Sequence, residues 1–179
     1  LCSLCICNRK SQALIGFCWR VWYAGAFVGS RCSGSCPSEL LRLARAKLPE
    51  DAGDKYALLL GDFGALPIDP ASVDTVLLHQ VLHYAQAPEQ VIAQAAQVLR
   101  PGGRVLIVDF AAHEREELRT RDQHARLGFS DMQIEGWFAQ AGLELERVDV
   151  LPGQELTVQL WLGRQRGADI LPIEERISA

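Results

Sequence analysis

Four side chains that could bind or orient a small ligand follow one run of apolar residues. The stretch Val73–Leu78 is largely apolar and contains β-branched residues, as is typical of a strand buried on both faces. His79 and Gln80 follow it directly, and His83 and Tyr84 lie in the next turn. Imidazole can act as a general base near neutral pH, although each histidine could equally fill a hydrogen-bonded structural role. We therefore predict the rim of a site at the end of this strand.

Two more strand ends carry polar groups. Asp109 lies at the end of the strongest predicted strand, Arg104–Phe110, and His113 follows this strand. Both residues should therefore lie on the substrate side, although Asp109 could instead cap the next loop. Asp62 ends another short apolar stretch and could accept a hydrogen bond from an adenine amino group, with Phe63 as an apolar wall and backbone donor. The alternative is that Gly61-Asp62 is a simple turn.

No metal site is predicted. His79 and His83 have the i, i+4 spacing of zinc ligands on a helix, but the sequence offers no evident third ligand.

The elements that would position these groups alternate along the chain. Helical periodicity and capping residues predict helices at residues 38–48, 88–99, 114–126 and 130–141, and apolar runs predict strands at 56–60, 73–78, 104–110, 143–151 and 156–163. This order predicts an α/β fold with a doubly wound, mostly parallel sheet, whose last two strands form an antiparallel edge hairpin. Ligands of such sheets bind at the carboxyl ends of the strands.

The composition changes abruptly near residue 36. Residues 1–36 hold all six cysteines and no acidic residue, whereas residues 37–179 hold all 22 acidic residues and no cysteine. We therefore predict an atypical Cys-rich segment at 1–36 and the main domain at 37–179. The net charge of −4 disfavours a nucleic-acid surface on this domain. Because the chain begins with Leu1 and its one methionine is Met132, we expect a fragment or a processed product.

Several short motifs resemble one enzyme family when their order is considered. They are GDFGALP at 61–67, VDTV at 73–76, HQVLHY at 79–84 and LRPGGR at 99–104. Together they resemble class I S-adenosylmethionine-dependent methyltransferases of the UbiE-like, type 11 kind, over residues 38–163. The VLHY, VDF and RLGFSD stretches resemble more closely the methyltransferase domain fused behind ArsR-type winged-helix regulators.

The resemblance implies S-adenosylmethionine as the cofactor, a Rossmann-like fold and methyl transfer. It implies that Asp62 and Phe63 contact the adenine, and we expect Gly61, His79 and Gln80 to contact the cofactor as well. If the acceptor must lose a proton, we expect His79, His83 or His113 to act as the general base. We expect a small-molecule acceptor, no membrane partner and a cytoplasmic protein. The alternatives are a regulator fragment with a methyltransferase-like sensor domain, and an inactive pseudoenzyme.

One part of the family pattern is missing. The Gly-x-Gly-x-Gly loop of these enzymes, whose backbone N–H groups approach the cofactor, should fall near residues 12–20, and an acid that holds the ribose should fall near 34–36. Gly16 is the one glycine in the first interval, and the second holds no carboxylate. We therefore expect the first strand and its loop to be missing or replaced, and methyl transfer to be impaired.

Residues 1–36 have three interpretations. Ala13–Gly29 is apolar enough to suggest a membrane or secretory segment, but it is short and contains Arg20. The cysteines could bind zinc or form disulfides, but their spacing does not match paired C-x-x-C knuckles. We favour the third interpretation, a coding segment read in a shifted frame, because the family pattern breaks where the composition changes.

Overall fold

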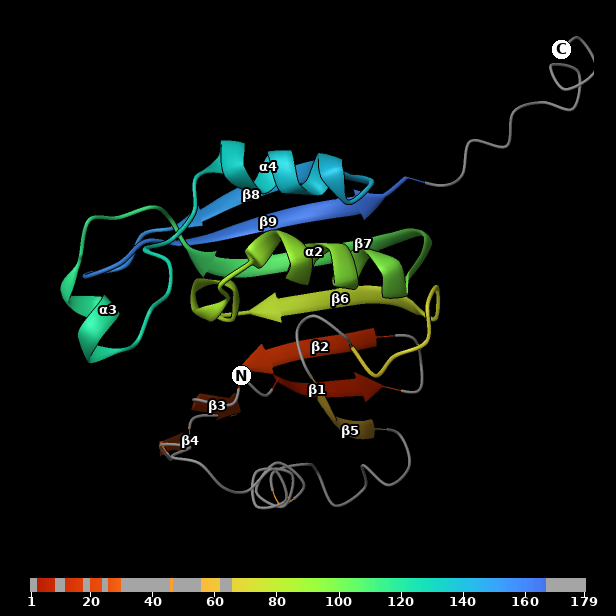
Figure 1. The fold of residues 1–179 in the computed structure, drawn as a ribbon, viewed down its shortest axis with the longest axis horizontal. Helices are drawn as coiled ribbons and strands as arrows, with labels where there is room; N and C mark the ends of the chain where they lie inside the picture. Colours follow the sequence, from red (N-terminus) through yellow and green to blue (C-terminus); the bar gives the residue numbers. More distant parts are fainter. Residues whose placement is uncertain are drawn as a thin grey trace, which may run out of the picture.

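The computed structural model describes residues 66–166 in full and, as backbone alone, residues 3–8, 12–17, 20–23, 26–29, 46 and 56–61. Its centre is a seven-stranded sheet in the order β5-β1-β2-β6-β7-β9-β8 (Figure 1). The strands are β1 (Ser3–Asn8), β2 (Gln12–Phe17), β5 (Tyr56–Gly61), β6 (Val73–His79), β7 (Leu99–Phe110), β8 (Leu143–Leu151) and β9 (Val158–Gln165). A separate two-stranded sheet pairs β3 (Arg20–Tyr23) with β4 (Ala26–Gly29).

The sheet is mixed. Strands β2, β6 and β7 are parallel neighbours, whereas β1 and β9 run antiparallel to the strands on either side of them. The predicted edge hairpin is confirmed, since β8 pairs antiparallel with β9 and lies at the end of the sheet. The predicted mostly parallel sheet is confirmed in part: β2, β5, β6 and β7 all run in the same direction, whereas β1 lies antiparallel between β2 and β5 in the sheet.

The expected replacement of the first strand has a counterpart in the structure, because the N-terminal segment supplies the strand next to β6. Two strands, β1 and β2, lie between β5 and β6. Strand β2 pairs in parallel with β6, and Gly16 lies opposite His79 in the ladder. The position next to β6 is therefore occupied by residues 12–17, which the apolar composition of this stretch allows.

Two helices cover one face of the sheet. Helix α2 (Pro88–Val98) begins with proline at its first turn, and α4 (Asp131–Gln140) begins at a capping box in which Ser130 and Gln133 satisfy each other's backbone N–H groups. Figure 1 shows α2 over β6 and β7 and α4 over β8 and β9. The predicted helix at residues 38–48 lies outside the described residues, apart from Ala46.

The core lies between these helices and the sheet. Trp161 of β9 and Phe138 of α4 are fully buried, together with Leu78 and Ile107 of the central strands. Trp161 Nε1 donates to Asp131 Oδ1 over 2.7 Å, so the one polar group of this ring is satisfied at the beginning of α4. None of the helices among the described residues is long and apolar enough to cross a membrane.

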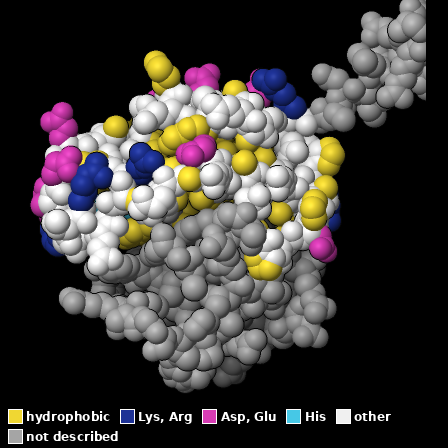
Figure 2. All heavy atoms as spheres, viewed as in Figure 1, with side chains coloured by type: hydrophobic (Ala, Val, Ile, Leu, Met, Phe, Trp, Pro, Cys, Tyr) yellow, Lys and Arg dark blue, Asp and Glu magenta, His cyan; other side chains and the backbone are white. Residues whose placement is uncertain are grey.

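The helix predicted at 114–126 is much shorter in the structure. Helix α3 spans Glu117–Arg121, and the chain then turns at Gln123, whose φ is +58°. The predicted length was wrong because the charged residues pair with one another locally, and this pairing does not extend the helix. Arg119 donates to Glu116 and to the carbonyl of Ala125, which closes the turn after the helix. Figure 2 shows acidic and basic side chains interspersed at this end of the molecule, as is typical of a solvated face.

Candidate functional site

The candidate site lies at the carboxyl ends of β6 and β7. Figure 1 shows both strands ending on the side where α3 lies, and a short 3₁₀ helix, η2 (Leu82–Tyr84), follows β6 there. His79 is the last residue of β6, and Asp109 is the last but one of β7. These are neighbouring parallel strands, so the structure brings together the polar groups that the sequence placed at two separate strand ends.

Asp109 joins β7 to the turn after β6. Its side chain is fully buried, and its Oδ2 accepts the backbone N–H groups of Leu82 at 2.9 Å and His83 at 3.4 Å. Its Oδ1 accepts the Nδ1–H of His83 at 2.6 Å and the backbone N–H of Phe110 at 2.8 Å. A buried carboxylate with four donors is well satisfied. Asp109 therefore holds η2 and the His83 ring in place, rather than only capping the following loop.

His83 is held on all sides. Its side chain is 2% exposed, and its ring packs against Tyr84, Phe110 and His124, with centroids 4.1, 5.0 and 4.4 Å away. Because a carboxylate oxygen accepts, the ring donates its Nδ1–H to Asp109, and Nε2 is the nitrogen left outside this bond. The Asp109–His83 pair thus has the form of an oriented base, as in other acid–histidine pairs.

His79 and Gln80 form the outer part of the site. His79 is exposed, yet partial loss of water around the ring lowers its pKa, an effect that the nearby charge of Asp109 opposes. Gln80 has a φ of +53°, in the left-handed region that residues with a side chain rarely adopt, while its N–H continues the ladder to Val108 O at 2.8 Å. Backbone strain of this kind costs on the order of 1–3 kcal/mol and clusters at ligand sites.

His113 and His124 complete a cluster of aromatic rings around Phe110. The rings of His124 and Phe110 are stacked at 5.7 Å with an interplanar angle of 16°, and His113 meets Phe110 edge-on at 6.3 Å. Burial lowers the pKa of His124 to about 4, and the neighbouring His83 contributes to this shift. Burial also lowers the pKa of His113, and the charge of Arg115 has the next largest effect, in the same direction. His124 was not predicted, because no local pattern around it marks a site.

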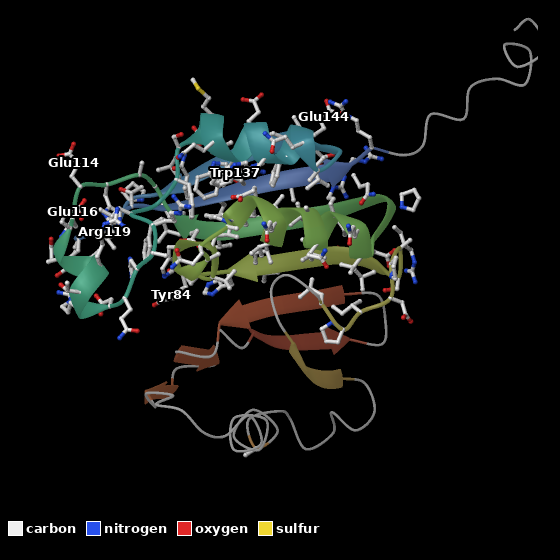
Figure 3. All side chains as sticks on the ribbon, in the orientation of Figure 1. Tyr84, Glu114, Glu116, Arg119, Trp137 and Glu144 are labelled. Atoms are coloured by element: carbon white, nitrogen blue, oxygen red, sulfur yellow. The ribbon has the colours of Figure 1, made fainter. Side chains whose placement is uncertain are left out.

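The RLGFSD motif fixes the segment that carries these rings. Backbone N–H groups of Ala125 and Arg126 donate to the carbonyl of His83 at 2.9 and 3.0 Å. Gly128 has a φ of +75°, and a side-chain carbon there would overlap the Ala111 carbonyl, so glycine is required. Phe129 is buried beside Trp137, whose position on α4 Figure 3 labels. The motif thus closes residues 111–129 over the end of the sheet.

The remaining predicted residues lie around this centre or outside the described part. Gly61 ends β5, at the far side of β1 and β2 from His79. Asp62 and Phe63, the predicted adenine contacts, lie outside the described residues. Tyr84, which Figure 3 labels, is half-buried in η2, just after the carboxyl end of β6. Within the described part of the chain, no three His, Cys, Asp or Glu side chains come together as a metal site.

Comparisons with known proteins point to one family. Residues 20–107 match the family model described as "Methyltransferase domain" (Methyltransf_11). An uncharacterized methyltransferase of Geobacillus thermodenitrificans is 31% identical over 91 residues, which are 49% of this chain and 42% of that protein. An arsenite methyltransferase of Halobacterium salinarum is 34% identical over 71 residues, 40% of this chain and 18% of that one. The chain therefore spans less than half the length of these relatives.

A solved structure supports the fold. A putative methyltransferase in complex with the Trm112 methyltransferase activator of Haloferax volcanii superposes with a TM-score of 0.62 at 22% identity, covering 72% of this chain and 69% of that one. The matched motifs, the strand order of the C-terminal half and the family model agree with one another. The chain belongs to the class I S-adenosylmethionine-dependent methyltransferases and carries a type 11 methyltransferase domain.

Proposed function

We propose that this chain transfers a methyl group from S-adenosylmethionine to a small-molecule acceptor at the carboxyl ends of β6 and β7. One observation carries the proposal: His79, Gln80 and the Asp109–His83 pair gather at two neighbouring parallel strand ends. Open parallel sheets bind their ligands outside such ends. The strained backbone of Gln80 at the same place further supports a ligand site.

The residues present fit one part of the cofactor better than the other. His79 and Gln80 offer an exposed and a half-buried polar side chain where the methionine end would lie. Opposite His79, the β2 backbone carries Gly16, so no side chain projects from β2 at that point of the ladder. The Gly-x-Gly-x-Gly pattern, however, is represented between residues 12 and 20 by Gly16 alone. We therefore propose that the chain binds the cofactor far more weakly than relatives with a complete loop.

When bound, S-adenosylmethionine supplies an electrophilic methyl group on a positively charged sulfur. The protein would contribute proximity and in-line orientation of the acceptor. His79 is exposed and has a lowered pKa, so at neutral pH it is largely uncharged and able to take a proton from the acceptor. His83 is buried, so its role in this proposal is to position the turn that carries the site, with Asp109 holding its ring.

Calorimetric titration of the full chain with S-adenosylhomocysteine tests the proposal. The double substitution Cys18→Gly and Arg20→Gly completes the glycine pattern that Gly16 begins. It should raise the affinity by about tenfold or more, since removal of the two side chains lets backbone N–H groups already present approach the cofactor, and each hydrogen bond so formed is worth about 1 kcal/mol. His79→Ala in that background should then lower turnover at least as much as binding.

Gln140→Ala serves as the matched control, because Gln140 is exposed in the last turn of α4, away from these strand ends. It should leave binding unchanged. Micromolar binding by the unaltered chain would contradict the proposed weakness. The absence of any binding after the glycine pattern is completed would contradict cofactor use by this chain.

A further inference from the structure

Strand β8 has one free edge. It ends the seven-stranded sheet, so this edge faces away from every other strand that the structure describes. Such an edge presents backbone N–H and C=O groups that can pair with a strand of another chain. A bulge between Leu145 and Arg147 interrupts the ladder near the beginning of β8, and Pro152 follows its last residue, Leu151. The regular part of the free edge is therefore residues 147–151.

One end of this edge exposes apolar side chains. Val150 and Leu151 are 54% and 55% exposed, and together with Met132 they are the large apolar residues that the described part of the chain leaves exposed. Met132 lies in the first turn of α4. The preceding Asp131 accepts from the side chain of Gln159, which is the ladder partner of Val150. The beginning of α4 and the end of β8 therefore lie close together, and their apolar side chains are typical of an interaction surface.

Two charged side chains on the same edge determine which partner strand fits. Arg147 and Asp149 are two residues apart in β8, so they lie on the same face of the sheet. They also pair with each other, with Arg147 Nε 2.6 Å from Asp149 Oδ2 and Nη2 2.8 Å from Oδ1. A positive and a negative charge thus lie on either side of Val148. A second β8 strand, antiparallel and related by a twofold axis at Val148, would set Arg147 of each copy opposite Asp149 of the other.

Neighbouring registers lack this match. A twofold axis at Arg147 or at Asp149 sets two like charges directly opposite each other, which destabilises a strand pair. An axis at Val150 sets Pro152, which has no N–H to donate, opposite Val148. The charges on this edge therefore oppose general strand pairing and favour one self-complementary register.

We propose that the free edge of β8 is an interface with a second copy of this chain, in which the two β8 strands pair antiparallel about Val148. The occupant is a second copy because the charges of this edge are complementary to those of the same edge turned by a twofold axis. The inference is independent of the proposed function, since β8 contains none of the candidate site residues. Because the regular edge is short, association should be weak and should depend on concentration.

Sedimentation equilibrium of the full chain over a range of concentrations tests the interface. The natural chain should show an equilibrium between monomer and dimer. Arg147→Asp and Asp149→Arg each set like charges opposite each other twice about the axis, and each should weaken the dimer by about tenfold or more. An equimolar mixture of the two variants should recover the dimer, because each variant then meets the opposite charge on the other. A role of this ion pair within one chain cannot produce that recovery.

The exposed pair of Arg100 and Asp74 is the matched control. Its charged groups are 2.9 Å apart at the beginning of β6 and β7, away from the edge. Arg100→Asp and Asp74→Arg should leave the dimer unchanged, alone and mixed, and circular dichroism should show that every variant keeps its fold. A natural chain that stays monomeric at all concentrations would overturn the interface. A dimer that survives Arg147→Asp would place the contact on another surface, and a mixture that stays monomeric would refute the pairing about Val148.

Discussion

Replacement of the His124 imidazole should reduce the amount of unfolding free energy that this protein loses when the pH is lowered. The ring is buried against Phe110 and His83, and its pKa falls from 6.5 to about 4 on folding. Loss of water is the main cause, and charges on His83 and His113 act in the same direction. The carboxylates of Asp122 and Asp109 oppose the shift. Since the folded state binds this proton more weakly than the unfolded state, acid favours unfolding at this residue.

The magnitude follows from the two pKa values. The contribution of a neutral His124 is complete above pH 6.5 and is lost as the pH falls from there toward 4. Linkage between these values removes about 2 kcal/mol of unfolding free energy between pH 7 and pH 5. His124→Phe keeps an aromatic ring stacked on Phe110 but cannot take up a proton. The variant should therefore lose about 2 kcal/mol less than the natural chain over this interval.

Urea unfolding followed by circular dichroism at pH 7, 6 and 5 measures this difference. The comparison between the two proteins removes the contributions of all other titrating groups, provided that the urea dependence of both is the same. His79→Gln is the matched control, since His79 is exposed and its removal should change the pH profile less. Parallel profiles for the natural chain and His124→Phe would refute the reasoning, because they would mean that His124 titrates normally in the folded state.

Three further substitutions test the supports of the site by the same unfolding measurement. Asp109→Asn turns an amide N–H₂ toward buried donors that include His83 Nδ1, and should lower the unfolding free energy by about 3 kcal/mol. A loss below about 1 kcal/mol would mean that the pair is not buried as described. Gly128→Ala combines a φ of +75° with overlap of the Ala111 carbonyl, and should destabilise by more than about 2 kcal/mol. Gly136→Ala should instead stabilise the protein by about 0.5–1 kcal/mol, because Gly136 lies within α4 with open space around it; equal effects of the two glycine substitutions would contradict the structure.

Much of the C-terminal fold could be predicted from the sequence. The strands β6 and β8, the helix α4 and the edge hairpin agree with the predicted ranges to within one or two residues. These elements carry strong local signals: a continuous apolar run for β6, a capping box at Ser130 and a glycine at the end of α4, where Gly142 has a φ of +76°. Local chemistry and tertiary packing favour the same structure in these places.

Other features could not be predicted because they depend on partners distant in sequence. The short α3 reflects competition between helix formation and the side-chain bond from Arg119 to the Ala125 carbonyl. The reversed direction of β1 depends on its pairing with β2 and β5, which periodicity alone does not specify. The burial of His124 depends on Phe110 and His83, whereas Asp122 and Gln123, which precede it in the chain, are polar. A histidine in a polar stretch gives no signal of such a position.

The candidate site nevertheless explains why three motifs that are separate in sequence occur in the same chain. VLHY supplies His83, VDF supplies the buried Asp109 that holds it, and RLGFSD begins with the Arg126 N–H that donates to the His83 carbonyl. Each motif therefore completes hydrogen bonds begun by another, and none would be satisfied alone. VLHY follows β6 and VDF ends β7, whereas β2, which contains Gly16 of the incomplete glycine pattern, pairs with the other edge of β6. The Asp109–His83 pair and the turn after β6 are thus held by contacts among these three motifs.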